Sequence, residues 1–312
     1  MSTITNHSDL CQFLRDLTQL LLFTAMKTIL VPTDFSKGAE AALDFAIQTA
    51  RQQKARLLLF NAFSGRLPYS SLPYELIAEE SRRTASGVEK QMQSLCLKID
   101  YAGDVQYDFI LKEGPAIASI LKIANDYDID LIVMGTRGES RVLDMLMGST
   151  TSGVIAEASC PVIAVPPHVF FNNTLKKITY ASNLLETDIE AIRSVVELAR
   201  PVNAIVSILH VADPGAEPEM EVKRLNEFMD LVEKRIAYSR FSCELLSGKT
   251  PIEALQDYMI ARKSDVLVLS TARRNLMQKL FAGSITKDLI KDAPVPVIAF
   301  HHRKHSKVRL YI

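Results

Sequence analysis

The chain has 312 residues, 48% of them hydrophobic and 23% charged, which is typical of a globular protein with a sizeable core. Lysine and arginine together number 36, as do aspartate and glutamate, so no net charge points to nucleic acid or to a membrane surface. The four cysteines are far apart and form no CxxC pair. This spacing argues against a disulfide framework or a zinc site, and it fits a reducing cytoplasm.

Residues 1–25 form an N-terminal extension ahead of the main pattern. Apolar residues recur at helical spacing between Leu10 and Leu21, which predicts a short amphipathic helix, although a leader without fixed structure fits equally well. Arg15 and Asp16 interrupt the apolar stretch and no basic segment precedes it, so we do not interpret it as a signal peptide. No run in the chain reaches the roughly 18 apolar residues that a membrane span needs.

From residue 26 onward, short apolar runs alternate with longer segments of helical periodicity. Runs of this kind, with little polar alternation, are typical of strands buried on both faces of a parallel sheet. The pattern therefore predicts a doubly wound α/β fold with helices on both faces of the sheet. We expect strands near 28–33, 56–62, 105–111, 130–135 and 162–166, and helices near 36–53, 74–98, 114–127 and 149–158.

The same succession of elements occurs twice along the chain. Lys27–Arg51 aligns without a gap on Lys176–Arg200, an offset of 149 residues, and the next apolar run follows at the same offset. The sequence thus predicts two tandem Rossmann-like domains, each with a five-stranded parallel sheet, at residues 26–167 and 175–301. Residues 302–312 are left as a basic tail.

One segment of the first copy, GTRGESRVLDMLMGST at residues 135–150, indicates a binding loop. Gly135 and Gly138 permit a tight turn or the close approach of a ligand, and Gly148-Ser149 presents helix N-terminal amides that suit phosphate. Asp34 follows the first strand, where a carboxylate can accept hydrogen bonds from ribose hydroxyls. Three glycines alone would more often be turns, but here the loop, the acid and the strand ends meet at one edge of the sheet.

The pattern G-x2-G-x9-G-[ST] with an Asp after the first strand resembles the ATP-binding branch of the universal stress protein family. Nearly all of residues 26–300 share the resemblance, which implies an adenine-nucleotide alpha hydrolase-like fold and a pseudo-dimer of the two copies. It also implies ATP as ligand, often with Mg2+ or Mn2+, and a capacity to form homodimers, commonly through the fifth strands. By this resemblance the nucleotide in the first copy would contact Pro32, Thr33, Asp34, Ala62, Met134, Gly135, Arg137, Gly138, Gly148, Ser149, Thr150 and Thr151.

The second copy departs from this pattern. Asn183 replaces Asp34, Ser270 replaces Gly135 and Arg273 replaces Gly138, while Gly283-Ser284 is retained. An arginine adds bulk where a phosphate must approach the backbone. We therefore predict that the second copy is a degenerate site that does not bind ATP.

Three functions are compatible with the sequence. The first is an ATP-binding, stress-associated regulatory module with little or slow hydrolysis. The second is an enzyme of the same fold, an ATPase or a nucleotidyl transferase, and the third is an interaction protein without nucleotide. The loop lacks the lysine of a P-loop, and no base for water can be assigned, so the sequence supplies no catalytic residue.

The histidines offer no metal site that the sequence can define. His301, His302 and His305 lie in the basic tail without evident further ligands, which favours a solvated tail. His210, late in a strand of the second copy, is expected to be a satisfied core or rim histidine, since no nucleophile lies beside it.

Overall fold

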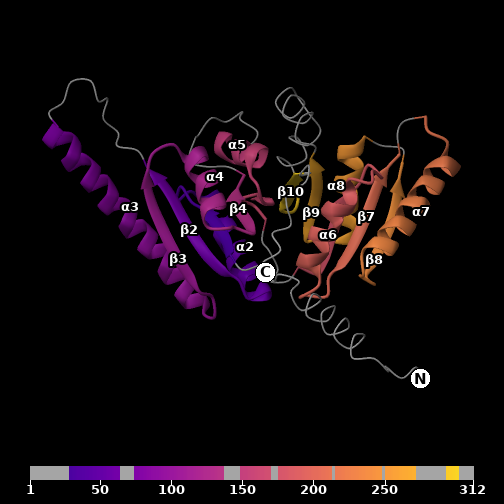
Figure 1. Ribbon diagram of the computed structural model, residues 1–312, viewed down its shortest axis with the longest axis horizontal. Coiled ribbons are helices and arrows are strands. Elements are labelled where there is room, and N and C mark those ends of the chain that lie inside the picture. The colour runs from indigo at the N-terminus through magenta and orange to yellow at the C-terminus, as the bar shows by residue number, and fades with distance from the viewer. Residues whose placement is uncertain are drawn as a thin grey trace, which may run out of the picture.

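The computed structural model describes residues 28–63, 74–136, 148–169, 175–212, 215–247, 250–271 and 293–301. These residues form two halves, each built from alternating strands and helices (Figure 1). The first half contains β1 (Thr28–Pro32), α2 (Lys37–Gln53), β2 (Arg56–Phe63), α3 (Tyr74–Ala102), β3 (Tyr107–Glu113), α4 (Ala116–Asp126), β4 (Leu131–Gly135), α5 (Ser149–Glu157) and β5 (Val162–Val165). The second half contains β6 (Lys177–Ala181), α6 (Asp188–Ala199), β7 (Ile205–Val211), α7 (Pro218–Arg235), β8 (Phe241–Leu246), α8 (Pro251–Arg262), β9 (Val266–Thr271) and β10 (Val297–His301).

Every strand and helix predicted for the first half is present, and the differences lie at the ends. The helix expected at 74–98 continues to Ala102, because Ile99 still packs in the core and Gly103, with a φ of 70°, stops it. The ends of the other helices are set by local contacts. Ser36, for example, accepts a hydrogen bond from the amide of Ala39 and so caps the start of α2, while Lys54 ends that helix in the left-handed conformation.

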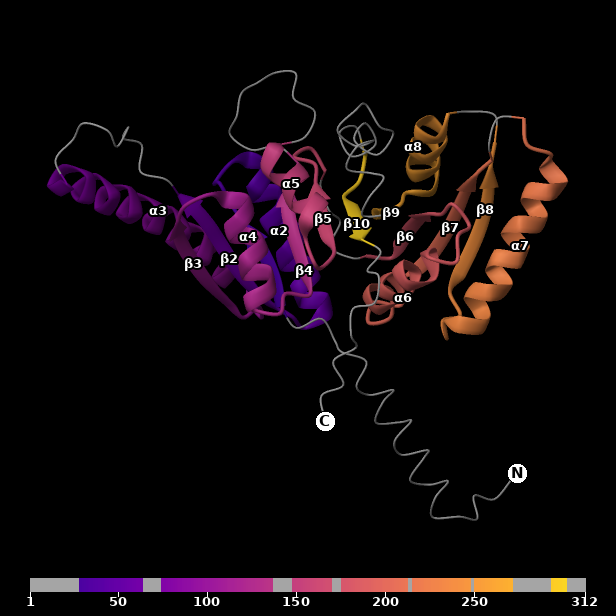
Figure 2. The same ribbon diagram turned by 45° about the horizontal axis from the view of Figure 1, so that its top comes forward.

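The strands form one continuous ten-stranded sheet in the order β3-β2-β1-β4-β5-β10-β9-β6-β7-β8. Pairing is parallel within each half, as predicted, but β5 and β10 pair antiparallel, with Ile163 opposite Ile298. The two five-stranded sheets expected from the sequence are therefore joined edge to edge (Figure 2). The physical reason is that β5 and β10 are edge strands of their own halves, and each satisfies the open backbone groups of the other.

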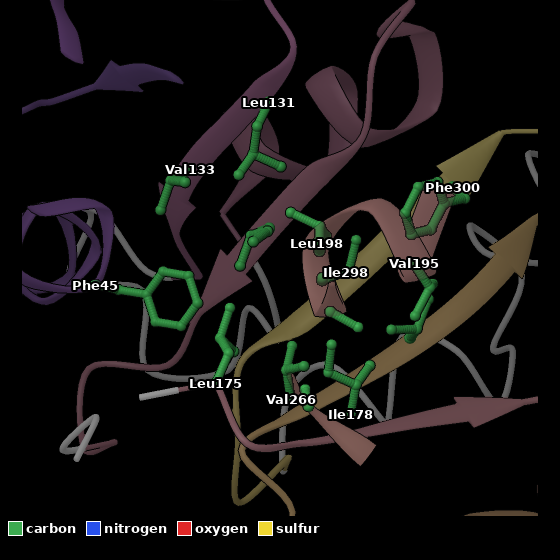
Figure 3. Packing of buried hydrophobic residues seen from close by; sticks show 14 of the residues in the cluster. Phe45, Leu131, Val133, Leu175, Ile178, Val195, Leu198, Val266, Ile298 and Phe300 are labelled. Atoms are coloured by element: carbon green, nitrogen blue, oxygen red, sulfur yellow. The ribbon is translucent and has the colours of Figure 1, made fainter. Parts of the chain in front are cut away.

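Helices cover both faces of this sheet. On one face, α2, α3, α6 and α7 contribute to a core cluster that runs through both halves, and α4, α5 and α8 contribute to the cluster on the other face. Figure 3 shows the first cluster where the halves meet, with Phe45 and Val133 of the first half and Val195 and Ile298 of the second as members of the same cluster. A shared apolar core of this kind fixes the two halves against each other.

Polar contacts also join the halves. The side-chain amide of Gln53, only 5% exposed at the end of α2, donates to the carbonyl oxygen of Leu198 on α6 at 3.0 Å. Gln52 accepts from the amide of Leu175 at 3.3 Å. Helix α2 therefore has one end at the boundary between the halves and its other end at the carboxyl edge of the sheet.

Within the described ranges, no helix is long and apolar enough to cross a membrane.

Candidate functional site

A cavity of about 330 Å³ opens at the carboxyl end of the first half's sheet. It lies where the strand order reverses between β1 and β4, the position at which open parallel sheets bind ligands. Strands β1, β2 and β4 and the starts of α2, α4 and α5 supply its walls. The lining residues are Pro32, Thr33, Asp34, Ala39, Phe60, Ala62, Ala116, Ile120, Met134, Gly135, Gly148, Ser149, Thr150 and Thr151.

Ten of the twelve residues that the sequence predicted for the site line this cavity. The other two, Arg137 and Gly138, lie outside the described residues. Sequence reasoning missed four lining residues, all apolar: Ala39, Phe60, Ala116 and Ile120. Buried apolar residues carry no polar signal, and only the packing of α4 over the sheet brings Ala116 and Ile120 to the cavity.

The turn between β1 and α2 is fixed by its own side chains. The hydroxyl of Thr33 accepts from the amide of Phe35 at 3.0 Å, and the carboxylate of Asp34 accepts from the amide of Ser36 at 3.1 Å. Phe35 itself has a φ of 62°, so the turn is tight. These bonds place the exposed carboxylate of Asp34 at the mouth of the cavity.

The side chain of Asn61 on β2 also holds the turn that follows β1. Its side-chain amide donates to the carbonyl oxygen of Thr33 at 2.8 Å, and the amide of Thr33 donates to Phe60 at 2.8 Å. Asn61 is 5% exposed, so this bond is shielded from water. The end of β1 is thereby held by both its backbone and a neighbouring side chain.

The start of α5 forms the opposite wall of the cavity. Gly148 precedes the helix and provides no side-chain cap, so the first-turn amides have no acceptor within the helix. The hydroxyl of Thr151 donates to the carbonyl oxygen of Gly135 at 2.8 Å, and the amide of Gly148 donates to Thr136 at 2.8 Å. These bonds tie the helix to the end of β4, so its positive N-terminal end is held at the cavity.

The cavity combines three kinds of surface. Its apolar part is formed by Pro32, Phe60, Ala62 and Ile120, and a carboxylate and a helix N-terminus border it. Such a site suits a molecule with a flat apolar part, hydroxyl groups and an anionic end. Within the described ranges, no group of three or more His, Cys, Asp and Glu side chains could hold a metal ion.

The corresponding turn of the second half has different chemistry. Asp188, at the position equivalent to Ala39, is 3% exposed and accepts hydrogen bonds from the hydroxyl of Ser182 at 2.8 Å and the amide of Asn183 at 3.2 Å. A buried carboxylate thus lies where the first half has a methyl group. Arg273 and Gly283-Ser284, the other positions compared from sequence, lie outside the described residues.

His210 is buried in the second half, with both ring nitrogens within hydrogen-bond distance of an oxygen atom. This agrees with the satisfied histidine expected from the sequence. The cluster of His301, His302 and His305 is not described beyond His301, which ends β10.

Comparison with known proteins agrees with this architecture. The model of the universal stress protein family matches the chain twice, over residues 26–166 and residues 174–301. A universal stress protein of Thermus aquaticus is 35% identical over 140 residues, which are 45% of this chain and 98% of that protein. Universal stress protein MJ0577 of Methanocaldococcus jannaschii is 29% identical over 153 residues, or 45% of this chain and 94% of that protein.

A solved structure extends the likeness to both halves. A universal stress protein from Archaeoglobus fulgidus superposes with a TM-score of 0.71 and 18% identity, covering 89% of this chain and 97% of that one. At that identity the likeness concerns the fold. Because the family model matches most of the chain in two successive segments, the chain belongs to the universal stress protein family and carries two of its domains in tandem.

Proposed function

We propose that the first half binds ATP in the cavity between β1, β4 and α5. The observation that carries this proposal is the meeting of an apolar pocket, the carboxylate of Asp34 and the uncapped N-terminus of α5 in one cavity. Adenine suits the apolar walls, ribose hydroxyls can donate to Asp34, and phosphates suit helix N-terminal amides. The spacing of Gly135, Gly138 and Gly148 in the sequence supports the same ligand.

The roles of individual residues follow from their places in the cavity. Pro32, Thr33, Ala62 and Met134 would surround the base and ribose, and Gly148, Ser149 and Thr150 would face the phosphates. Thr151 would act mainly by holding α5, since its hydroxyl proton is already donated to Gly135. Mg2+ or Mn2+, when bound with ATP, would neutralise part of the phosphate charge.

We further propose that occupancy of this cavity serves regulation, with little or slow hydrolysis. The described part of the cavity offers Asp34 as its only carboxylate, and no lysine or histidine lines it. It therefore offers binding groups without a positioned base for water. ATP turnover well above that of a binding-deficient variant would instead favour the enzymatic alternative.

The second half is proposed to be without nucleotide. The carboxylate of Asp188 is buried at the start of α6, so an anionic nucleotide entering this half would meet a carboxylate where the first half presents the methyl group of Ala39. One nucleotide per chain is therefore expected. The pairing of β5 with β10 within one chain supports an intramolecular pseudo-dimer, and a further homodimer stays a prediction that light scattering can check.

Titration calorimetry with ATP on the full chain tests the proposal. Asp34→Ala should weaken binding about tenfold or more, the effect of losing a hydrogen bond to a charged group. Asn183→Ala, the matched change in the second half, should leave affinity and the stoichiometry of one unchanged. Circular dichroism confirms folding. Absence of binding by the folded chain, or unchanged affinity in Asp34→Ala, would contradict the proposed site.

A further inference from the structure

The second half contains a buried charged network that links the end of β7 to the start of α7. The Nε2 atom of His210 lies 2.8 Å from Oε2 of Glu221, and Oε1 of Glu221 accepts from Arg224 at 2.7 Å. His210 and Glu221 are 8% and 4% exposed, while the side chain of Arg224 reaches solvent. The other ring nitrogen of His210, Nδ1, lies 2.9 Å from the backbone carbonyl oxygen of Ser182.

This geometry assigns a protonation state to the histidine ring. A backbone carbonyl oxygen can only accept a hydrogen bond, so Nδ1 must carry a proton. Burial alone would raise the pKa of Glu221, but hydrogen bonds from Arg224 and His210 outweigh it and lower that pKa. Because Oε1 of Glu221 also accepts from the guanidinium of Arg224 at 2.7 Å, the carboxylate is the ionised acceptor, and a hydrogen bond to it from Nε2 requires a proton on that nitrogen. A ring with two N–H groups is the imidazolium cation.

The first half provides an internal comparison at the same position. Asn61 is the counterpart of His210 at the repeat offset of 149 residues. Its side-chain amide makes the equivalent bond, to the carbonyl oxygen of Thr33 at 2.8 Å, just as His210 bonds to Ser182. An asparagine amide does not titrate, so the first half makes this brace without a proton. The second half makes it with a titratable ring and adds a bond to α7.

Two other ionisable groups, Asp188 on α6 and Tyr180 on β6, lie around the Ser182 turn that His210 contacts. Asp188 on α6 accepts from the hydroxyl of Ser182 and from the amides of Asn183 and Leu185. Burial, and next the charge of Asp188, raise the pKa of Tyr180 on β6, so this phenol stays neutral. Among the side chains that face this site from β6, α6 and α7, histidine is the type that ordinarily changes charge between pH 5 and 8.

We propose that His210, Glu221 and Arg224 form a proton-operated latch that holds the start of α7 against the carboxyl end of β7. With the ring protonated, His210 donates to both Ser182 and Glu221. When the pH rises and the ring loses a proton, a single N–H remains for two acceptors, and the buried carboxylate of Glu221 loses a donor. The latch is therefore closed on the acidic side and opens as the pH rises, which makes the second half a pH-responsive element.

NMR of the full chain labelled with 15N-histidine tests the protonation state directly. The chain has six histidines, so the signals of His210 are assigned by their absence in His210→Asn. At pH 6.5 we expect both ring nitrogens of His210 to show the imidazolium signature. As the ring loses its proton at higher pH, amide protection factors at the start of α7 should fall about tenfold, the effect of losing one hydrogen bond to a charged group.

His210→Asn is also the matched control, because asparagine at this position can keep the bond to Ser182, as Asn61 does to Thr33. Its protection factors at α7 should not change over the same pH range. A neutral His210 ring at pH 6.5, or the same pH response of α7 in both proteins, would overturn the proposal.

Glu221→Gln provides a second test if His210→Asn fails to fold. Glutamine keeps the size of the side chain but removes the charge that stabilises the imidazolium, so the ring signals of His210 should titrate at a lower pH than in the natural sequence. An unchanged midpoint in a folded Glu221→Gln protein would show that no such coupling exists.

Discussion

The Cα of Gly135 at the end of β4 packs directly against the backbone of Gly38 in the first turn of α2. A methyl group built on Gly135 would lie 2.5 Å from both the carbonyl carbon and the carbonyl oxygen of Gly38. Backbone atoms cannot rotate out of the way as a side chain can. The approach of strand and helix that shapes one wall of the cavity therefore depends on glycine at residue 135.

Gly135→Ala should destabilise the protein by about 1–3 kcal/mol, because the new methyl group would displace the start of α2. The same displacement should weaken ATP binding, since Asp34 and Ala39 lie on that turn. Urea unfolding and calorimetry measure the two effects. Gly87→Ala is the control: it lies within α3 with no atom within 4 Å of the added methyl group, and should stabilise by roughly 0.5–1 kcal/mol. Wild-type stability in Gly135→Ala would contradict the prediction.

Thr151→Val should lower the stability of the protein by about 0.5–1.5 kcal/mol, the typical net value of one hydrogen bond. Thr151 is 4% exposed, and its hydroxyl is the link between α5 and the carbonyl oxygen of Gly135. Loss of this link should also loosen the helix N-terminus at the cavity and weaken ATP binding. Thr151→Ser retains the hydroxyl and should restore most of the affinity; if valine and serine behave alike, the hydroxyl has no positioning role.

Gln53→Ala should destabilise the junction of the two halves by about 1–3 kcal/mol. The substitution removes the buried hydrogen bond to the carbonyl oxygen of Leu198 and leaves that acceptor unsatisfied. Differential scanning calorimetry should show a lower midpoint. Gln91→Ala, an exposed position on α3, is the matched control and should change the midpoint little. Equal midpoints for the two variants would show that the contact is not stabilising.

Glu197→Gln should raise stability at neutral pH and leave it unchanged in acid. Glu197 borders a cavity of about 140 Å³ between the halves, together with Asp130. Partial burial raises its pKa, and Asp130 adds to this against the opposing charges of Arg193 and Arg200. An acid with a raised pKa in the folded state destabilises that state as the pH rises above the ordinary glutamate value of about 4.3.

Urea unfolding at pH 7 and at pH 3.5 measures the free energy of unfolding of Glu197→Gln with the natural carboxyl group ionised and protonated, respectively. Glu190→Gln is the control on the same helix, since the Glu190 side chain is 76% exposed and lies 3.8 Å from Arg193. A gain in stability of Glu197→Gln at both pH values would mean that the cause is not the charge of the carboxylate.

Much of the fold could be predicted because its signals are local. The buried run of β1 is apolar throughout, Ser36 is an N-cap three residues before Ala39, and the offset of 149 residues reveals the duplication. The polar and glycine positions of the site could also be predicted, because Asp34 and Gly135 follow strands whose carboxyl ends share one edge of the sheet. That these residues bind ATP stays a proposal.

The apolar lining of the cavity and the partner of His210 could not be predicted, because they depend on contacts between residues far apart in the chain. Ala116 and Ile120 reach the cavity only because α4 packs over β2, and a sequence pattern does not say which strand a helix covers. The sequence predicted only that His210 is a core or rim histidine whose hydrogen-bonding groups have partners. Its partner Glu221 lies on a helix whose register against β7 is set by apolar packing, and so the charged network could not be foreseen.

By itself, the sequence determined that the protein has two α/β units, that the first has an acid and three loop glycines at its strand ends, and that the second lacks that acid and the first two of those glycines. These properties follow from periodicity, propensity and spacing, which act over a few residues at a time. Tertiary structure decided that the two sheets merge through β5 and β10, that α2 runs from the cavity to the boundary between the halves, and that His210 lies against Glu221 of α7. Such features arise from burial and pairing of distant groups, whose free energy exists only once the chain has folded.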